Sequence, residues 1–372
     1  RSRAITDIYI AINKGLRRLP GRLAVATVLG NAVFSFVTGV SIASAATFSR
    51  ISYPEMKAHG YDRGFALGVI AGSSCLGMLI PPSVLMIVWG ILTEQSIGRL
   101  FLAGVLPGIL LATMMIAYIM VMAIVRPEVV GEGRKLAATL PDPDIPDTAQ
   151  AALDPTQFFI SLAGVISIVG AVLGGIWWGL FTPTEGAGAG AALALVLAMI
   201  KGMKLRGFID SIYSVGKTAA PILILLLAAA LYSRTLAMTG VTSSIRDLFV
   251  GSGLQPWSVL AIIVLIWFVL GMLIDSISIM LLTVPIVEPV AMAFGFDQLS
   301  FAIVGIVAIE AGLLTPPFGL LVYTVKAAIK DDDIGVQQIF WSSVPYWIIM
   351  LVAAALMILF PQIANVLPNV MM

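Results

Sequence analysis

Glycine, proline and hydroxyl residues gather at four points of an otherwise apolar sequence. Two of these points are the dipeptides Pro81-Pro82 and Pro316-Pro317. Each dipeptide lacks backbone N–H groups and interrupts a helix, so nearby carbonyl oxygens lose their helical partners. Such oxygens, together with hydroxyl groups, suit a hard cation such as sodium, and the N-termini of the interrupted helices attract a carboxylate. The pattern therefore predicts one site for a cation and an organic anion together.

The other two points are a Gly/Ser/Thr-rich stretch at residues 38–44 and a Gly-to-Asp stretch at residues 271–276. The candidate substrate-binding residues carry hydroxyl or carboxyl groups at the four points: Thr38, Ser41, Ser44, Ser83, Asp275 and Ser276. The candidate cation ligands offer backbone or side-chain oxygen there: Gly39, Gly77, Ile80, Pro81, Gly271, Asp275, Gly312, Thr315 and Pro316. The four clusters are better supported as a site than any single residue in them, because a hydroxyl group in a membrane helix usually forms a hydrogen bond with its own backbone.

Two carboxyl groups lie inside apolar segments, where a charge is costly and marks a functional site by default. Asp275 is predicted to coordinate the cation or to bind a substrate hydroxyl group. Glu310 precedes the second Pro-Pro pair, and three roles stay open for it: a protonated acid, a partner of a helix, or part of the site. Glu185, in contrast, is predicted to cap a helix N-terminus. His59 and Cys75 are expected to be inert.

The composition places these residues in a membrane protein. The chain has 372 residues, of which 59% are hydrophobic and only 11% charged, and its mean hydropathy is +1.03. Soluble domains carry about 25% charged residues, so the sequence predicts an all-α polytopic membrane protein. The net charge of +1 offers no field for nucleic acid. One histidine and one cysteine disfavour zinc, haem and an enzyme of the Ser/His type, and no nucleotide cofactor is expected.

The apolar segments divide into ordinary and interrupted spans. Because the arms on either side of Gly39 and Gly271 are shorter than the about 20 residues that cross a bilayer, they are predicted to form re-entrant hairpins. The predicted order is an amphipathic interfacial helix over 1–22, hairpin 23–56, broken helix 63–93, helix 98–125, a cytoplasmic linker over 126–156, three connecting helices over 157–240 with an interfacial helix at 203–215, hairpin 256–288, broken helix 299–329 and helix 338–360. The first repeat is thus 23–125 and the second 256–367.

Basic residues orient these spans. With both hairpins returning to their side of entry, 18 of the 21 Lys and Arg residues lie on one side, and only Arg99, Arg234 and Arg246 lie on the other. The positive-inside rule makes the richer side cytoplasmic. Residues 1–22 are therefore predicted to be cytoplasmic, and the C-terminus is predicted to lie on the opposite side.

The two interrupted regions form an internal repeat. A shift of 235 residues aligns Ser41 with Ser276 and both Pro-Pro pairs, with 12 identities over residues 41–82; about three or four would occur by chance at this composition. An odd number of crossings separates the copies, so they have opposite orientation. Inverted repeats with broken helices at matching positions are typical of secondary transporters whose site lies near the middle of the membrane.

Five motifs resemble the large membrane subunit (M, or DctM-like) of TRAP transporters, the tripartite ATP-independent periplasmic systems. The motifs are Gly77 to Ser83, Phe101 to Gly108, Phe181 to Glu185, Gly271 to Asp275 and Glu310 to Gly319. The resemblance implies an elevator-type sodium symporter for organic acids such as C4-dicarboxylates, 2-oxo acids or sialic acid. It also implies the bacterial inner membrane, a periplasmic C-terminus, a small four-helix membrane subunit (Q) and a periplasmic substrate-binding protein (P).

Two positions depart from the family pattern: Ser44 stands where Asp is common, and Ser276 where Pro often follows the Asp. The family's large subunit also begins well before Arg1, so further N-terminal helices are expected. The alternatives are a proton-coupled organic-anion carrier and an ion channel. A channel is disfavoured because its pore needs repeated polar rings.

Overall fold

The computed structural model describes residues 4–16, 18–131, 155–200, 202–329, 331 and 333–371. This part of the chain is almost entirely helical, and its one β-type pairing is an isolated bridge between Tyr61 and Val130. The prediction of an all-α protein is therefore confirmed. Of the predicted linker, the structure describes a short 3-10 turn at Pro127–Val129 (η1), whereas residues 132–154 lie outside the described residues.

Several helices meet the length and hydropathy requirements of a membrane span, as expected for a polytopic protein. Five described helices do so: Ile97–Val125 (α7), Pro183–Ile200 (α10), Leu205–Thr239 (α11), Ser276–Ala293 (α14) and Val336–Leu359 (α17). The pair Arg63–Leu79 and Val84–Thr93, which is bent by 40°, would add a sixth. By length α14 could cross a membrane alone, but its place after a tight turn also fits a hairpin arm.

The first half of the bundle begins with two helices joined by a turn of two residues. Arg22–Thr38 (α2) and Ser41–Ala58 (α3) pack side by side. Gly39 ends α2 with a φ of +61°, a left-handed conformation that glycine adopts without steric cost. The chain therefore reverses where the sequence places the first hairpin tip.

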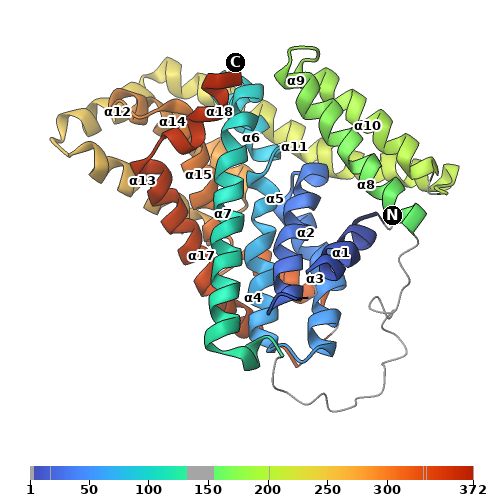
Figure 1. The fold of residues 1–372 in the computed structure, drawn as a ribbon. Coiled ribbons are helices and arrows are strands. Elements are labelled where there is room, and N and C mark those ends of the chain that lie inside the picture. Colours follow the sequence, from blue (N-terminus) through green and yellow to red (C-terminus); the bar gives the residue numbers. More distant parts are fainter. Residues whose placement is uncertain are drawn as a thin grey trace.

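A helix interrupted in its middle follows the first helix pair. Arg63–Ser74 (α4) and the short turn Leu76–Leu79 (α5) end at Ile80, which is extended. After the Pro-Pro pair, Ser83 caps Val84–Thr93 (α6), and α7 then runs through the centre of Figure 1. This break occurs because neither proline supplies the N–H that a continuing helix needs.

The second half repeats this order of elements. Pro256–Gly271 (α13) and α14 form the second helix pair, and Gln298–Gly312 (α15) and Leu320–Ala328 (α16) flank the second break. Asp297 caps α15 as its aligned residue Asp62 caps α4, each accepting a hydrogen bond from the backbone N–H three residues on. The repeat in sequence is therefore also a repeat in local structure.

The two halves interlock around one core. α3 packs against α16 while α14 packs against α6, and α17 packs against α4 while α7 packs against α15. These contacts come in matching pairs, as two copies related by a pseudo-twofold axis require. Buried aromatic rings join the halves: Trp89 of α6 lies 5.9 Å from both Trp267 and Phe301 between ring centroids.

A peripheral layer lies beside this core. It consists of Pro155–Val169 (α8), a π-helical turn at Gly170–Gly174 (η2), Gly175–Trp177 (α9), α10, α11 and Val241–Gly251 (α12). Figure 1 shows α8 and α10 together at the upper right, apart from the central bundle around α7. Most side chains of α10 and α11 are exposed, and many of the exposed ones are large and apolar, as for surfaces that meet lipid or another membrane protein. Glu185 and Thr182 form the predicted N-terminal cap of α10, because Thr182 N–H donates to Glu185 Oε2 at 2.8 Å.

The predicted interfacial helix over 203–215 is not a separate element. Its residues form the first part of α11, which continues without a break for 35 residues. Glycines with positive φ stand only at the ends of this stretch, at Gly202 (+85°) and Gly240 (+74°). No turn interrupts the helix between them, and the hydrophobic pattern alone could not reveal this continuity.

Two short helices near the ends of the chain pack on the bundle. Ala4–Gly15 (α1) packs across α2 and buries Ile8 and Tyr9. It occupies the segment predicted to be an amphipathic interfacial helix. Gln362–Met371 (α18) packs on α7 at the other end of the chain.

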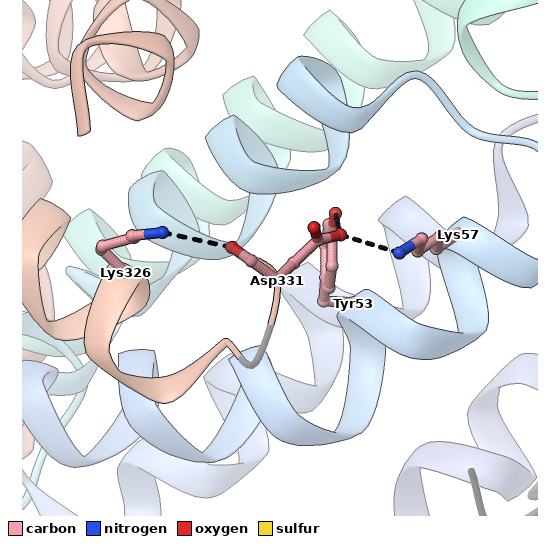
Figure 2. Close-up of polar contacts among 4 residues, drawn as sticks. All are labelled: Tyr53, Lys57, Lys326 and Asp331. Carbon is pink, nitrogen blue, oxygen red and sulfur yellow. Dashed lines mark hydrogen bonds and ion pairs between the residues drawn. The ribbon is translucent and has the colours of Figure 1, made fainter. Parts of the chain in front are cut away.

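A polar cluster ties the far end of α3 to the connection after α16 (Figure 2). Lys57 Nζ lies 2.7 Å from Asp331 Oδ2, and the Tyr53 hydroxyl donates to the same oxygen at 3.2 Å. Lys326 Nζ donates to the backbone carbonyl of Asp331 at 3.1 Å. The hydrogen bond from Lys57 lowers the pKa of the Asp331 carboxyl group. The cluster therefore links the first hairpin to the second half of the bundle.

Candidate functional site

The first tip and the first break are in direct contact. The backbone N–H of Val84 donates to the carbonyl of Gly39 at 3.2 Å. A Cβ added at Gly39 would collide with the carbonyl oxygen of Pro82. Glycine is therefore needed here both for the left-handed turn and for the close approach of the two backbones.

Ser41 and Ser44, at the start of α3, face the other side of the same break. A Cβ at Gly77 would lie 3.0 Å from Ser41 Cα and 3.0 Å from Ser44 Oγ, so glycine lets this turn pack closely against the start of α3. Both serines are fully buried, and neither hydroxyl oxygen has a hydrogen-bond partner among the described residues. Because a buried hydroxyl without a partner costs free energy, these two oxygens are available to a ligand.

The second tip and the second break also meet. The backbone N–H of Phe318 donates to the carbonyl of Met272 at 3.1 Å. A Cβ at Gly271 would lie 2.8 Å from the Cα of Gly312, so the two glycines permit close helix contact. The environment differs from that of the first break, because residues 316–318 are exposed whereas Pro81 and Ser83 are buried.

The carboxyl group of Glu310 lies where the repeats join. Its side chain is buried, and Oε1 accepts a hydrogen bond from Ser276 Oγ at 2.7 Å. Ser41 lies near the same carboxyl group, although its hydroxyl forms no hydrogen bond with it, and the thiol of Cys75 contacts the backbone carbonyl of Glu310 at 3.8 Å. These residues form two aligned pairs of the repeat, Ser41 with Ser276 and Cys75 with Glu310. The pseudo-twofold axis therefore passes close to this carboxyl group.

Asp275 has a local role that the sequence did not suggest. Its Oδ1 accepts from the backbone N–H of Ser278 at 3.0 Å, and its Oδ2 accepts from the Ser278 hydroxyl. The carboxyl group therefore caps α14, and it is partly rather than fully buried. Its predicted part in cation or substrate binding stays a prediction.

The remaining predicted hydroxyl groups are bonded to the backbone. Thr38 donates to the carbonyl of Phe34 at 3.0 Å, and Thr315 donates to that of Gly312 at 2.6 Å. Ser83 donates to the carbonyl of Met78 and caps α6. The structure thus separates the predicted set into hydroxyls with a partner and the two without one, Ser41 and Ser44.

The structure also forms a buried polar pair between α2 and α4 that the predicted set omits. Asn31 Nδ2 of α2 donates to Ser73 Oγ of α4 at 2.7 Å, and Asn31 Oδ1 is buried without a partner in the described structure. An amide within the uncharged segment 23–49 was a signal for this contact, since such a group needs a hydrogen-bonding neighbour.

The chemistry available at the site is that of oxygen ligands. Carbonyl, hydroxyl and carboxyl oxygens converge there, and the N-termini of α3 and α14 begin at Ser41 and Ser276. Within the described part of the chain, no group of three or more His, Cys, Asp or Glu side chains could hold a metal ion. The arrangement therefore suits a weakly held monovalent cation better than zinc or another transition metal.

Comparison with known proteins adds an independent finding. Residues 1–363 match the family model "Tripartite ATP-independent periplasmic transporter, DctM component". The chain is 30% identical over 359 residues to the C4-dicarboxylate TRAP transporter large permease protein DctM of Pseudomonas aeruginosa, covering 96% of this chain and 80% of that protein. It is 31% identical to the ectoine/5-hydroxyectoine large permease UehC of Ruegeria pomeroyi (92% and 76% covered) and 28% identical to the sialic acid large permease SiaM of Vibrio cholerae (99% and 82% covered).

Proposed function

Because the chain belongs to the DctM component family of the tripartite ATP-independent periplasmic transporters, we propose that it takes up an organic acid driven by a sodium gradient. It is a large permease of this transporter class, a multi-pass membrane protein and a transport protein rather than an enzyme. The observation that carries the sodium proposal is the meeting of two hairpin tips and two helix breaks around buried oxygen atoms.

The cation proposal rests on the tips and breaks. At the first tip, Ser41 and Ser44 carry buried hydroxyl oxygens without partners among the described residues, and Gly77 of the break packs closely against both residues. At the second, Gly271 and Gly312 bring the backbones of tip and break together. Desolvated backbone and hydroxyl oxygens are the ligands that sodium accepts in broken-helix transporters.

The substrate proposal rests on helix N-termini. α3 and α14 begin at Ser41 and Ser276, which both lie near Glu310, and the positive ends of their dipoles attract a carboxylate. Relatives are named for C4-dicarboxylates, sialic acid and ectoine, and each of these molecules contains at least one carboxylate. We expect this chain to carry a substrate with the same group.

The movement proposal rests on the two layers of the fold. The central bundle contains both hairpins and both broken helices, and the peripheral layer of α8 to α12 lies beside it. An elevator-type movement would carry the bundle past a scaffold that includes this layer. The assembly would include a small membrane subunit and a periplasmic binding protein, in the bacterial inner membrane, with residues 1–22 in the cytoplasm and the C-terminus in the periplasm.

The proposal is tested by uptake into proteoliposomes that contain the chain, the small membrane subunit and the binding protein. Labelled candidate acids are offered under an imposed sodium gradient, an imposed proton gradient, or neither. We expect uptake to follow the sodium gradient and to stop when choline replaces sodium.

Two outcomes would contradict the proposal. Uptake that follows only the proton gradient would favour the proton-coupled carrier. Conductance that persists without alternating access, seen as large single-channel currents in planar bilayers, would favour a channel.

A further inference from the structure

A groove opens in the peripheral layer at the turn between α10 and α11. α10 ends at Ile200, Gly202 turns the chain with a φ of +85°, and α11 begins at Leu205. α10 packs on α8 and η2, whereas α11 packs on α12 and α14, so the two helices lead from this turn to different parts of the fold. Figure 1 shows the turn at the right of the molecule, away from the central bundle.

The groove has the size of a ligand pocket and a mostly apolar wall. Its volume is about 320 Å³, and small-molecule sites measure about 300–1,000 Å³. The described residues that line it come from both helices and the turn: Leu195, Met199, Met203, Lys204, Leu205 and Phe208. Met199 is 60% exposed and Leu205 is 74% exposed. Exposed apolar side chains around a hollow of this size suit a hydrocarbon chain.

The charge beside the groove has one sign. Among the described residues that line it, Lys204 carries a positive charge and none carries a carboxyl group. Arg206 follows in the first turn of α11, and between Glu185 and Asp210 the sequence contains three basic residues and no acidic one. The positive end of the α11 dipole adds to this charge instead of balancing it. The ligand that complements the groove therefore carries a negative charge.

We propose that this groove binds an anionic phospholipid. Its phosphate group would lie beside Lys204 and Arg206, and one acyl chain would lie against the apolar wall between α10 and α11. A lysine serves both parts of such a ligand, because its methylene stem packs along hydrocarbon while its ammonium group reaches the headgroup. The groove also belongs to the side predicted to face the cytoplasm, where anionic lipids attract basic residues.

The two properties of the groove together select this class of ligand. A small soluble anion would leave the apolar wall uncovered, and a lipid without net charge would leave the basic residues unbalanced. A bound lipid would hold the end of α10 and the start of α11 together and fix the depth of the peripheral layer in the membrane. Lipid binding here is independent of the ion that drives uptake, because the lining residues belong to neither tip and neither break.

The first test is a lipid titration of the full chain in detergent, followed by native mass spectrometry. Dioleoylphosphatidylglycerol and dioleoylphosphatidylcholine share their acyl chains and differ in net charge. We expect the wild type to bind phosphatidylglycerol at least about fivefold more tightly. Lys204→Gln/Arg206→Gln should remove this preference, since each basic residue near an anionic lipid contributes about fivefold in affinity. Equal binding of the two lipids by the wild type would overturn the proposal.

Matched controls are exposed basic residues that do not line the groove. Arg126 follows α7, and Lys217 lies further along α11. Arg126→Gln and Lys217→Gln should each keep the preference for phosphatidylglycerol within about twofold of the wild-type value. If either control lowers the preference as much as the double variant does, the lipid responds to total charge and the site is wrong.

The second test locates the lipid on the wild type and so does not depend on the folding of a variant. Phosphatidylglycerol with a photoactivatable diazirine in its acyl chain is crosslinked to the full chain in nanodiscs, and the labelled peptides are mapped. We expect labelling to concentrate at Leu195, Met199 and Phe208. Leu223 and Leu227 of α11, which are 64% and 66% exposed, report non-specific lipid contact. Equal labelling of both groups would contradict a defined site.

The crosslinking is repeated on the chain assembled with the small membrane subunit. Labelling that persists in the groove supports a bound lipid in the assembly. Labelling that disappears would mean that a protein segment covers the groove, and the lipid proposal would be overturned. Sodium-driven uptake is measured separately, so failure of this site leaves the proposed function standing.

Discussion

At the scale of single residues, the buried hydroxyl groups divide by whether they have a partner. Thr315 and Ser83 donate to carbonyls of their own local backbone, as hydroxyls in membrane helices commonly do. Ser41 and Ser44 have no such partner among the described residues, although both are fully buried. Leaving a buried polar group unpaired costs about 1–3 kcal/mol, so these two serines are the stronger candidates for ligand contacts.

Asp275 allows capping and ligand binding to be separated by experiment. Asp275→Ala removes the cap of α14, and we expect a loss of about 1 kcal/mol in stability together with a loss of uptake. Asp275→Asn retains an oxygen that can accept from the backbone N–H of Ser278 but has no charge. We expect it to melt like the wild type yet to transport at least about tenfold more slowly.

The measurements are the melting temperature and the initial uptake rate in proteoliposomes. Wild-type uptake by Asp275→Asn would assign the carboxyl group to capping alone and remove it from the predicted site.

At the scale of elements, the two helix pairs differ in how each tip fits the adjacent break. The first tip is buried against Pro82 and Val84, and the Lys57–Asp331 cluster anchors the far end of its second arm. The second tip contacts Phe318, but this break and the neighbouring Leu273 and Ile274 are exposed. The two aligned regions therefore share a backbone design and differ in their surroundings.

Gly39→Ala tests the fit of the first tip. The alanine would adopt a left-handed conformation, which costs about 1 kcal/mol or more, and would also collide with the Pro82 carbonyl. Gly253→Ala is a matched control, because Gly253 has a similar φ of +70° but no atom within 4 Å of the added Cβ.

We expect Gly39→Ala to lower the melting temperature more than Gly253→Ala does and to abolish uptake, while Gly253→Ala retains uptake. Equal effects of the two substitutions would mean that the contact between tip and break contributes nothing beyond backbone conformation. Thermal unfolding and uptake assays provide both readouts.

At the scale of the whole molecule, the distribution of basic residues determines the expected orientation. Of the 21 Lys and Arg residues, 18 lie on the side predicted to face the cytoplasm, where translocation retains positive charge. We expect the turn after α7 to lie on that side and the connection between α12 and α13 to lie on the other.

Single-cysteine labelling tests this orientation. Native Cys75 is buried and should not react. In intact spheroplasts, a membrane-impermeant maleimide should label Ser252→Cys, which is exposed between α12 and α13, but not Glu128→Cys after α7. Glu128→Cys should react only after the membrane is permeabilised. The reverse pattern of labelling would invert the predicted topology.

The membrane class, several helix ends and the internal repeat could be predicted from the sequence, because each has a local physical cause. The low charge content indicated a membrane protein, and Gly39 and the two Pro-Pro pairs marked where helices end, because left-handed turns and missing N–H groups act on the chain within a few residues. The internal repeat, visible as matching residues 235 apart, placed Ser41 and Ser276 in equivalent positions. Helices accordingly end at Thr38 before Gly39 and at Leu79 before the first Pro-Pro pair.

Which of these residues meet, and which of their atoms remain unpaired, depends on how the helices pack in three dimensions. The folded chain brings Ser276 and Ser41 to Glu310, uses Asp275 as a cap, and continues α11 through the predicted interfacial helix. The burial of a side chain and its hydrogen-bond partners depend on elements far apart in the chain, so residue type and spacing do not predict them. A glycine or a proline can end a helix by its own conformation. Whether an oxygen atom lacks a hydrogen-bond partner depends on every element that packs around it.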